Sequence, residues 1–144
     1  MDRGGWSAST VHLEGDRCLT AVAQCLREAV REGDFVARYG GEEFAVLLTS
    51  GGDNKATQVA KRLQQSVRQL HFPHPGLSNG AVVTISAGFA TSRPVAGDHA
   101  ADLIQLADEA LYRAKKQGRD RVVFAGQFND DSSAIAPVAK MAGR

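Results

Sequence analysis

Hydrophobic residues recur along the chain in segments of helical spacing, separated by shorter apolar runs of strand length. The first helix is predicted to begin at Asp16 and to end before Gly33, with an apolar face made by Leu19, Val22, Ala23, Leu26, Ala29 and Val30. A second helix is predicted by the spacing of Ala56, Val59, Ala60, Leu63, Val67 and Leu70. A third is predicted to end at Gly118 and carries Leu103, Leu106, Ala107, Ala110, Leu111 and Ala114.

Strand-like runs occupy the spaces between these helices. Apolar residues flank a glycine pair and predict a β-hairpin over roughly residues 34–49, and residues 81–90 and 121–125 predict further strands. The order helix, hairpin, helix, strand, helix, strand indicates an α/β or α+β fold in which helices cover one sheet. Residues 1–11 show no convincing pattern, and residues 126–144 are expected to form a flexible tail.

Composition and charge argue against nucleic-acid-binding, membrane-spanning and secreted classes of protein. The 144 residues are 43% hydrophobic and 23% charged, as in a single soluble domain, and the net charge of +1 offers no field for nucleic acid. No apolar run reaches the length of a membrane span, and no secretory signal is visible. Cys18 and Cys25 lie roughly 10 Å apart on a predicted helix, too far to bridge within it. We therefore expect a reduced, cytoplasmic chain with no nucleic-acid or membrane partner.

The segment Arg38-Tyr39-Gly40-Gly41-Glu42-Glu43-Phe44 carries the most chemical information. Adjacent glycines turn the backbone sharply and would let a polyphosphate lie close to the main chain. Neighbouring strand residues point to opposite faces, so one glutamate can face a metal while the other faces a ligand edge or solvent. A solvated turn is the plain alternative, but the whole heptapeptide between two strands favours a metal–nucleotide site.

Other polar groups each allow two interpretations. Lys115 and Arg119 could complement the C-terminal end of a helix or bind phosphates. Arg31 and Asp34 could form a surface ion pair or grip a guanine base and its phosphate. Asp16 could cap the first helix or accept the N1 and N2 protons of guanine.

In this order and spacing, these segments resemble one family, the GGDEF domains, which are the diguanylate cyclases of bacterial cyclic di-GMP signalling. The resemblance spans about residues 12–125 and rests on Arg38–Phe44, on Ala110–Lys115 with Gly118-Arg119, and on His12 with Gly15-Asp16. It implies a ferredoxin-like fold related to the palm of nucleotidyl cyclases and polymerases. It also implies that two GTP molecules, one on each domain of a homodimer, condense to cyclic di-GMP and two pyrophosphates.

The resemblance further implies a role for each site residue. Glu42 would bind a divalent metal, Mg²⁺ or Mn²⁺, and Glu43 would lie beside the ribose and the reacting hydroxyl. Asp16 would read guanine, and the phosphates would be held by Gly40, Gly41, Lys115 and Arg119. A product-inhibition site for cyclic di-GMP would be formed by Arg31, Asp34 and Arg62.

The chain departs from the family pattern at its start. The family places a strand with a metal-binding Asp, a turn with a guanine-reading Asn, and a helix before the His-x-x-Gly-Asp segment. Here the Asn position aligns with Ser7, and the Asp would precede Met1. We therefore expect a domain without its first strand, with a sheet edge exposed or paired to another chain. Truncation, a misplaced start codon and natural degeneration would each explain this.

Three functions remain open from the sequence. The first is a diguanylate cyclase domain whose turnover is slow, because Glu42 would lack its partner carboxylate. The second is a non-catalytic module that binds GTP or cyclic di-GMP. The third is a structural dimerisation remnant.

Overall fold

The computed structural model describes residues 8–49, 53–74, 80–92, 95–127 and 138–143. The elements follow one another as α1 (Ala8–Ala29), β1 (Phe35–Gly40), β2 (Glu43–Leu47), α2 (Asp53–Gln69), β3 (Ile85–Thr91), α3 (Ala100–Lys116), β4 (Val122–Gln127) and β5 (Val138–Gly143). The predicted combination of helices with a single sheet is confirmed.

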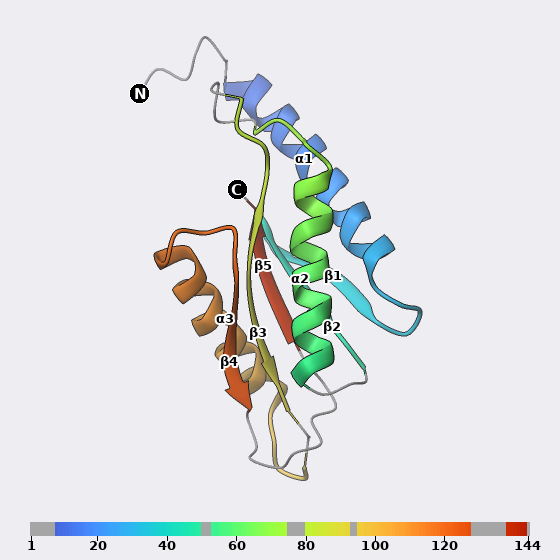
Figure 1. Ribbon diagram of the computed structural model, residues 1–144, viewed down its shortest axis with the longest axis vertical. Helices are drawn as coiled ribbons and strands as arrows, with labels where there is room; N and C mark the ends of the chain where they lie inside the picture. The colour runs from blue at the N-terminus through green and yellow to red at the C-terminus, as the bar shows by residue number, and fades with distance from the viewer. Residues whose placement is uncertain (1–7, 50–52, 75–79, 93–94, 128–137, 144) are drawn as a thin grey trace.

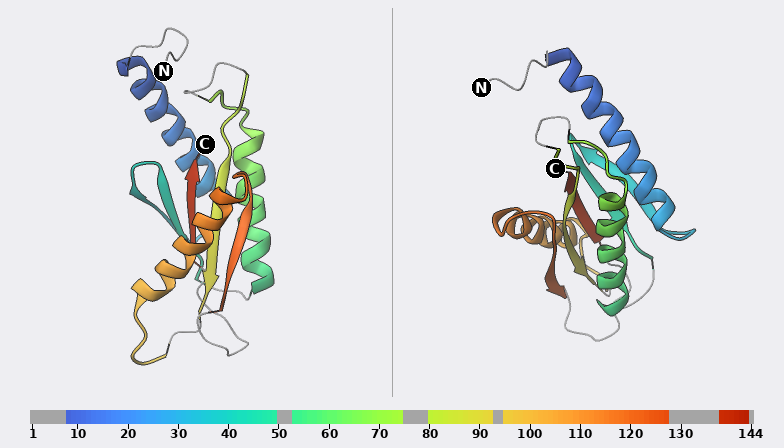
Figure 2. Two further views of the ribbon diagram at one scale, coloured as in Figure 1. Left: turned by 90° about the vertical axis from the view of Figure 1, so that its left-hand side faces the viewer. Right: turned by 45° about the horizontal axis from the view of Figure 1, so that its top comes forward.

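The strands form one five-stranded sheet in the order β1-β2-β5-β3-β4. β3 and β4 are parallel, whereas every other neighbouring pair is antiparallel. α1 and α2 pack together on one side of the sheet, and α3 crosses the other side (Figures 1 and 2). The fold therefore has helix, sheet and helix layers.

β3 is the core of the molecule, and all its residues are buried. Ile85, Ala87 and Phe89 belong to the main core cluster, together with apolar residues of α1 and α2 such as Leu26 and Leu63. A second cluster joins Ala90 of β3 to Leu103 and Ala107 of α3. Successive side chains of β3 thus pack alternately against α1 and α2 on one face and against α3 on the other, as expected for a strand that is covered on both faces.

Gly88 allows α3 to lie unusually close to the sheet. A Cβ atom at this position would stand 2.1 Å from the backbone nitrogen of Leu111 and 2.4 Å from the carbonyl oxygen of Ala107. Because these are backbone atoms, α3 can keep this position only over a glycine. The contact therefore sets the height of α3, and with it the position of Lys115, above the sheet.

The first helix is longer than the sequence pattern predicts. α1 begins at Ala8, so the prediction that the helix begins at Asp16 is wrong, and of the two interpretations of Asp16 the helix cap is excluded. Gly15 lies inside the helix, where a single glycine costs only about 1 kcal/mol and does not end it. Residues 8–11 of the segment expected to lack structure are helical, and residues 1–7 lie outside the described residues.

The centre of the sheet holds the largest difference from expectation. The flexible tail predicted for residues 126–144 is wrong for Val138–Gly143, which form β5 and pair with both β2 and β3. The edge expected to be exposed, or paired with another chain, is thus covered by a strand of the same chain. Val-Ala-Lys-Met-Ala-Gly is too short and too weakly alternating to indicate a strand. Pairing with the free edges of β2 and β3 stabilises it as a strand despite this weak pattern. Residues 128–137 lie outside the described part of the chain.

The remaining predicted elements are confirmed with small shifts. β3 begins at Ile85 instead of residue 81, because the segment before it makes only an isolated bridge between Pro73 and Val82. Among the described residues, no helix has both the length and the apolar character needed to cross a membrane.

Candidate functional site

The turn between β1 and β2 is an open loop built on two glycines. Gly40 has a φ of 151° and Gly41 a φ of 46°, a region that favours glycine. A Cβ atom on either residue would meet nothing within 4 Å, so the space beside the turn is free. The guanidinium of Arg38 closes the turn, because its Nε and Nη2 donate to the carbonyl oxygen of Gly41 at 2.9 and 2.7 Å.

The two glutamates of the motif lie in different surroundings. Glu42 is exposed in the turn, whereas Glu43 is the first residue of β2 and is partly buried. An Oε1 atom of Glu43 lies 3.8 Å from Nζ of Lys115 at the end of α3. This ion pair brings together two segments that sequence analysis assigned to one nucleotide site, although they are far apart in the chain.

α1 forms the third side of the site. Asp16 is exposed on this helix, and its carbonyl oxygen accepts a hydrogen bond from Oγ1 of Thr20 at 2.9 Å. Burial raises the pKa of the Cys18 thiol, and the negative charge of Glu42 raises it further. Glu42 is thus close enough to α1 for its charge to be felt there.

A cavity of about 330 Å³ separates α1 from the hairpin. Its walls are formed by residues of both elements: Leu19, Thr20, Ala23, Gln24, Arg27, Val36, Arg38 and Phe44. Thr20 connects the cavity to Asp16 through the hydrogen bond described above, and Arg38 connects it to the glycine turn. The cavity therefore lies one helical turn after Asp16 on α1 and next to the arginine that closes the glycine turn.

The predicted product-binding residues surround the turn between α1 and β1. The carboxylate of Asp34 is 4% exposed and accepts hydrogen bonds from the backbone nitrogens of Arg31 and Thr49, both at 3.2 Å. Nε of Arg31 is 3.9 Å from this carboxylate, and its side chain is 52% exposed. Arg62 donates to the carbonyl oxygen of Ala29 at 2.6 Å, which places it beneath the same turn. The structure brings all three residues to one region, with Asp34 already engaged by its own chain.

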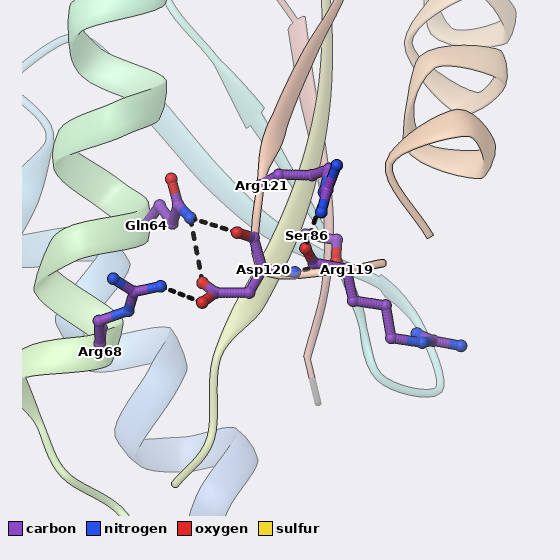
Figure 3. Close-up of polar contacts among 6 residues, drawn as sticks. All are labelled: Gln64, Arg68, Ser86, Arg119, Asp120 and Arg121. Carbon is purple, nitrogen blue, oxygen red and sulfur yellow. Dashed lines mark hydrogen bonds and ion pairs between the residues drawn. The ribbon is translucent and has the colours of Figure 1, made fainter. Parts of the chain in front are cut away.

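Arg119 lies in a tight turn directly after α3. Gly118, Arg119 and Asp120 have φ values of 118°, 63° and 45°, and the backbone nitrogen of Arg119 donates to the carbonyl oxygen of Ala114 at 2.9 Å. The guanidinium of Arg119 extends away from the neighbouring polar cluster (Figure 3). Lys115 and Arg119 thus both stand at the C-terminal end of α3.

The carboxylates fit a divalent metal that arrives with a nucleotide. Mg²⁺ is commonly held by one or two carboxylates together with substrate phosphates, and the exposed Glu42 beside an open glycine turn can supply such a ligand. No group of three or more His, Cys, Asp or Glu side chains able to hold a metal occurs within the described residues. β5, the strand next to β2, has the sequence Val-Ala-Lys-Met-Ala-Gly and brings no carboxylate.

Sequence analysis missed the residues that hold the site in place. Arg38 belonged to the recognised motif, but its role in closing the turn depends on a hairpin bulge that the sequence does not reveal. Ser86 and Asp120 bind each other at 3.1 Å, and Gln64 and Arg68 of α2 also bind Asp120. A signal was present in Ser86, which is a polar residue within the predicted buried strand.

The sheet with helices on both faces and the arrangement of the hairpin, α1 and α3 define a palm-like domain. The family model for "Diguanylate cyclase, GGDEF domain" matches residues 10–121. The chain therefore belongs to the GGDEF family, and the predicted fold is confirmed. The family generally uses a divalent metal.

Curated relatives agree with this assignment. The chain is 40% identical over 117 residues to diguanylate cyclase DgcP of Pseudomonas aeruginosa, which covers 79% of this chain and 16% of the relative. It is 36% identical over 111 residues to diguanylate cyclase DosC of Escherichia coli, which covers 77% of this chain and 24% of the relative. The chain thus spans less than a quarter of the length of these relatives.

Solved structures give the same result. The GGDEF domain of DgcB from Caulobacter crescentus, in complex with c-di-GMP, matches with a TM-score of 0.68 at 29% identity and covers 79% of this chain and 66% of that one. The active GGEEF domain of a diguanylate cyclase from Vibrio cholerae matches with a TM-score of 0.64 at 30% identity and covers 79% and 70%.

Proposed function

We propose that this chain is a diguanylate cyclase domain that condenses two GTP molecules to cyclic di-GMP and two pyrophosphates. The observation that carries the proposal is the 3.8 Å approach of Glu43 and Lys115, which joins the glycine hairpin to the cationic end of α3. Membership of the GGDEF family supports it. The Vibrio cholerae relative is described as an active GGEEF domain, and Gly40-Gly41-Glu42-Glu43-Phe44 has the same five residues.

Each segment of the site has a distinct task in substrate binding. The open turn at Gly40 and Gly41 lets the triphosphate lie against the main chain. Lys115 and Arg119 hold the β- and γ-phosphates, Lys as a mobile charge and Arg as a planar two-pronged donor. Asp16 accepts from the guanine edge, with the base directed towards the cavity between α1 and the hairpin.

The reaction needs two domains because each carries one nucleotide. The 3′-hydroxyl of each GTP attacks the α-phosphate of the other. Each of the two attacks forms one phosphodiester bond, breaks one bond to pyrophosphate and releases one hydroxyl proton to solvent. Glu43 lies beside this hydroxyl, and its partner Lys115 balances its charge. When bound, a divalent ion held by Glu42, Mg²⁺ or Mn²⁺, neutralises charge on the leaving pyrophosphate and lowers the pKa of the hydroxyl. We propose that a homodimer is the active species.

Turnover of this chain is proposed to be slow. β5 brings no carboxylate to the side of β2, and no group of three or more His, Cys, Asp or Glu side chains able to hold a metal includes Glu42 among the described residues. We expect a rate below about 1 s⁻¹, the lower end of ordinary enzyme turnover.

The test is to mix the purified chain with GTP and Mg²⁺ and to follow cyclic di-GMP by chromatography. The Glu42→Gln variant should make no product, because it removes the metal ligand without changing the shape of the side chain. Glu109→Gln on α3 makes the same chemical change away from the hairpin and should keep the parental rate. Equal rates for Glu42→Gln and the parent would overturn the proposal.

A second candidate function is a non-catalytic module that binds cyclic di-GMP. It is favoured by the convergence of Arg31, Asp34 and Arg62 on one turn, which needs no metal ligand. Calorimetry with cyclic di-GMP should show binding by the parent and weaker binding by Arg31→Ala. Product binding without any turnover would support the module over the enzyme. Neither binding nor turnover would leave only the dimerisation remnant.

A further inference from the structure

The turn that carries Arg119 has a conformation that ordinary residues rarely adopt. Gly118 is followed by Arg119 and Asp120, and all three have a positive φ. Glycine enters this region freely, but a residue with a Cβ atom is strained there. Such a conformation persists only when the surrounding structure specifies it, and such positions cluster at functional sites.

Residues of α2 and β3 hold this turn in its conformation through their contacts with Asp120. Nε2 of Gln64 donates to the carbonyl oxygen of Asp120 at 2.7 Å and to its Oδ1 at 3.0 Å. The guanidinium of Arg68 binds Oδ2 of the same carboxylate. The backbone nitrogen of Asp120 donates to Oγ of Ser86 at 3.1 Å, and Ser86 is 1% exposed. The network thus holds the side chain and both backbone polar groups of one residue (Figure 3).

These contacts tie the turn to elements that do not otherwise belong to the nucleotide site. Gln64 and Arg68 come from α2, on the opposite side of the sheet from α3, and Ser86 comes from β3. Arg121 adds a hydrogen bond from its Nε to the carbonyl oxygen of Arg119 at 3.0 Å. The backbone of the turn is therefore held by residues of α2 and β3 and by Arg121. The side chain of Arg119 points away from this network (Figure 3).

We propose that Asp120 is a positioning residue for nucleotide phosphates, which acts by holding Arg119 in its left-handed turn. The inference rests on the proposed function, because Arg119 is a phosphate ligand only if the chain binds GTP. An ordinary stabilising ion pair would need only the contact between Arg68 and the carboxylate. Here the carboxylate binds both Gln64 and Arg68, and two further contacts hold the backbone nitrogen and carbonyl oxygen of the same residue. Side-chain and backbone contacts together specify the conformation of the turn.

The experiment is a double-mutant cycle on GTP affinity, measured by calorimetry in the presence of Mg²⁺. Arg119→Ala and Asp120→Ala should each weaken GTP binding about tenfold or more, the scale of a hydrogen bond to a charged group. Asp120→Ala should have no further effect in the Arg119→Ala background, because Asp120 acts through Arg119. Asp120→Asn should recover most of the affinity, since Asn tolerates the left-handed region and keeps a side-chain acceptor.

Asp98 offers a matched control. Its Oδ2 accepts a hydrogen bond from the backbone nitrogen of Val95 at 2.9 Å, in a turn before α3 and away from Arg119. Asp98→Ala should leave GTP affinity unchanged. Gln64→Ala keeps the ion pair between Arg68 and Asp120 and should weaken GTP binding in the same way as Asp120→Ala. It is the variant to measure if Asp120→Ala fails to fold.

The outcomes separate the two proposals. A parent chain that binds no GTP would overturn the proposed function. A parent that binds GTP and loses affinity through Arg119→Ala but not through Asp120→Ala or Gln64→Ala would overturn the positioning role. Additive losses in the double variant would overturn it as well. A backbone readout needs no nucleotide: three-bond NMR couplings should report that Arg119 leaves its positive φ in Asp120→Ala, and an unchanged coupling would contradict the inference.

Discussion

Asp34 is enclosed to a degree that decides how the product-binding site should be tested. Its carboxylate is 4% exposed and holds the backbone nitrogen of Thr49, which joins the turn before β1 to the end of β2. Arg31 is half exposed, and its backbone contact with Asp34 does not depend on its side chain. The two residues therefore differ in what their removal does to the fold.

We predict that Asp34→Ala lowers the free energy of unfolding by about 1–3 kcal/mol, because the backbone nitrogens of Arg31 and Thr49 both lose a charged acceptor. Arg31→Ala should cost at most about 1 kcal/mol, as for an exposed ion pair. Urea unfolding of both variants is the measurement. A larger loss for Arg31→Ala than for Asp34→Ala would contradict the structure. Arg31→Ala is accordingly the cleaner probe of cyclic di-GMP binding.

Cys18 reports on the charge of Glu42. Burial raises the pKa of Cys18 and Glu42 raises it further, whereas the pKa of Cys25 is raised by burial and then by Glu28. Glu42→Gln should therefore speed the alkylation of Cys18 by iodoacetamide at mildly alkaline pH and leave Cys25 unchanged. Mass spectrometry resolves the two thiols. Equal acceleration of both would indicate a general loosening of α1 instead.

The same shift has a consequence for stability. A thiol whose pKa is raised on folding contributes stability that is fully present below its ordinary pKa of 9.0 and is lost as the pH rises through the raised value. The free energy of unfolding should therefore fall above pH 9, and less steeply in Cys18→Ala.

Among single residues, the sequence predicts those that belong to contiguous motifs. Gly40, Gly41 and the two glutamates are recognisable because turn geometry and charge act over neighbouring positions. The tasks of Asp34 and Asp120 are not recognisable, since their partners Thr49 and Gln64 are brought near only by the fold. An acidic residue in a turn looks the same in sequence whether it binds a ligand or its own chain.

At the scale of elements, the packing of α3 on β3 rests on Gly88. Gly88→Ala should lower the free energy of unfolding by about 1–3 kcal/mol or more, because the new methyl group meets backbone atoms of α3. Gly15→Ala makes the same change inside α1, where nothing lies within 4 Å, and should stabilise the protein by about 0.5–1 kcal/mol. Urea unfolding distinguishes them. Equal effects of both would mean that α3 does not lie so close to the sheet.

Helices and the hairpin are the elements that the sequence predicts well. Each has a long periodic pattern or a glycine pair that acts locally, as in α2 and at Gly40-Gly41. β5 escapes prediction because its pairing partners are β2 and β3, which are distant in the chain. The start of α1 escapes for a different reason: Asp16 resembles a cap, yet the helix continues through it.

At the scale of the whole molecule, β5 joins two parts of the sheet. Lys140 pairs with Ala45 of β2 and with Gly88 of β3. Lys140→Pro should abolish cooperative folding or produce oligomers, because proline removes a backbone donor from a central strand and leaves neighbouring edges unpaired. Urea unfolding and size-exclusion chromatography measure this. Lys140→Thr keeps the backbone donor and should remain a cooperative folder; normal folding of both variants would show that β5 is dispensable.

The place of β5 also has a consequence for how the protein comes to be folded. Among the described strands, the hairpin of β1 and β2 is hydrogen-bonded to the parallel pair of β3 and β4 only through β5, which follows all four in the chain. Contacts between residues far apart in sequence form late, because a long loop must close, with a loss of chain entropy, before the contacts can stabilise the chain. During synthesis on the ribosome, the edges of β2 and β3 would stay unpaired until β5 emerged, and chaperones would bind the chain in that state.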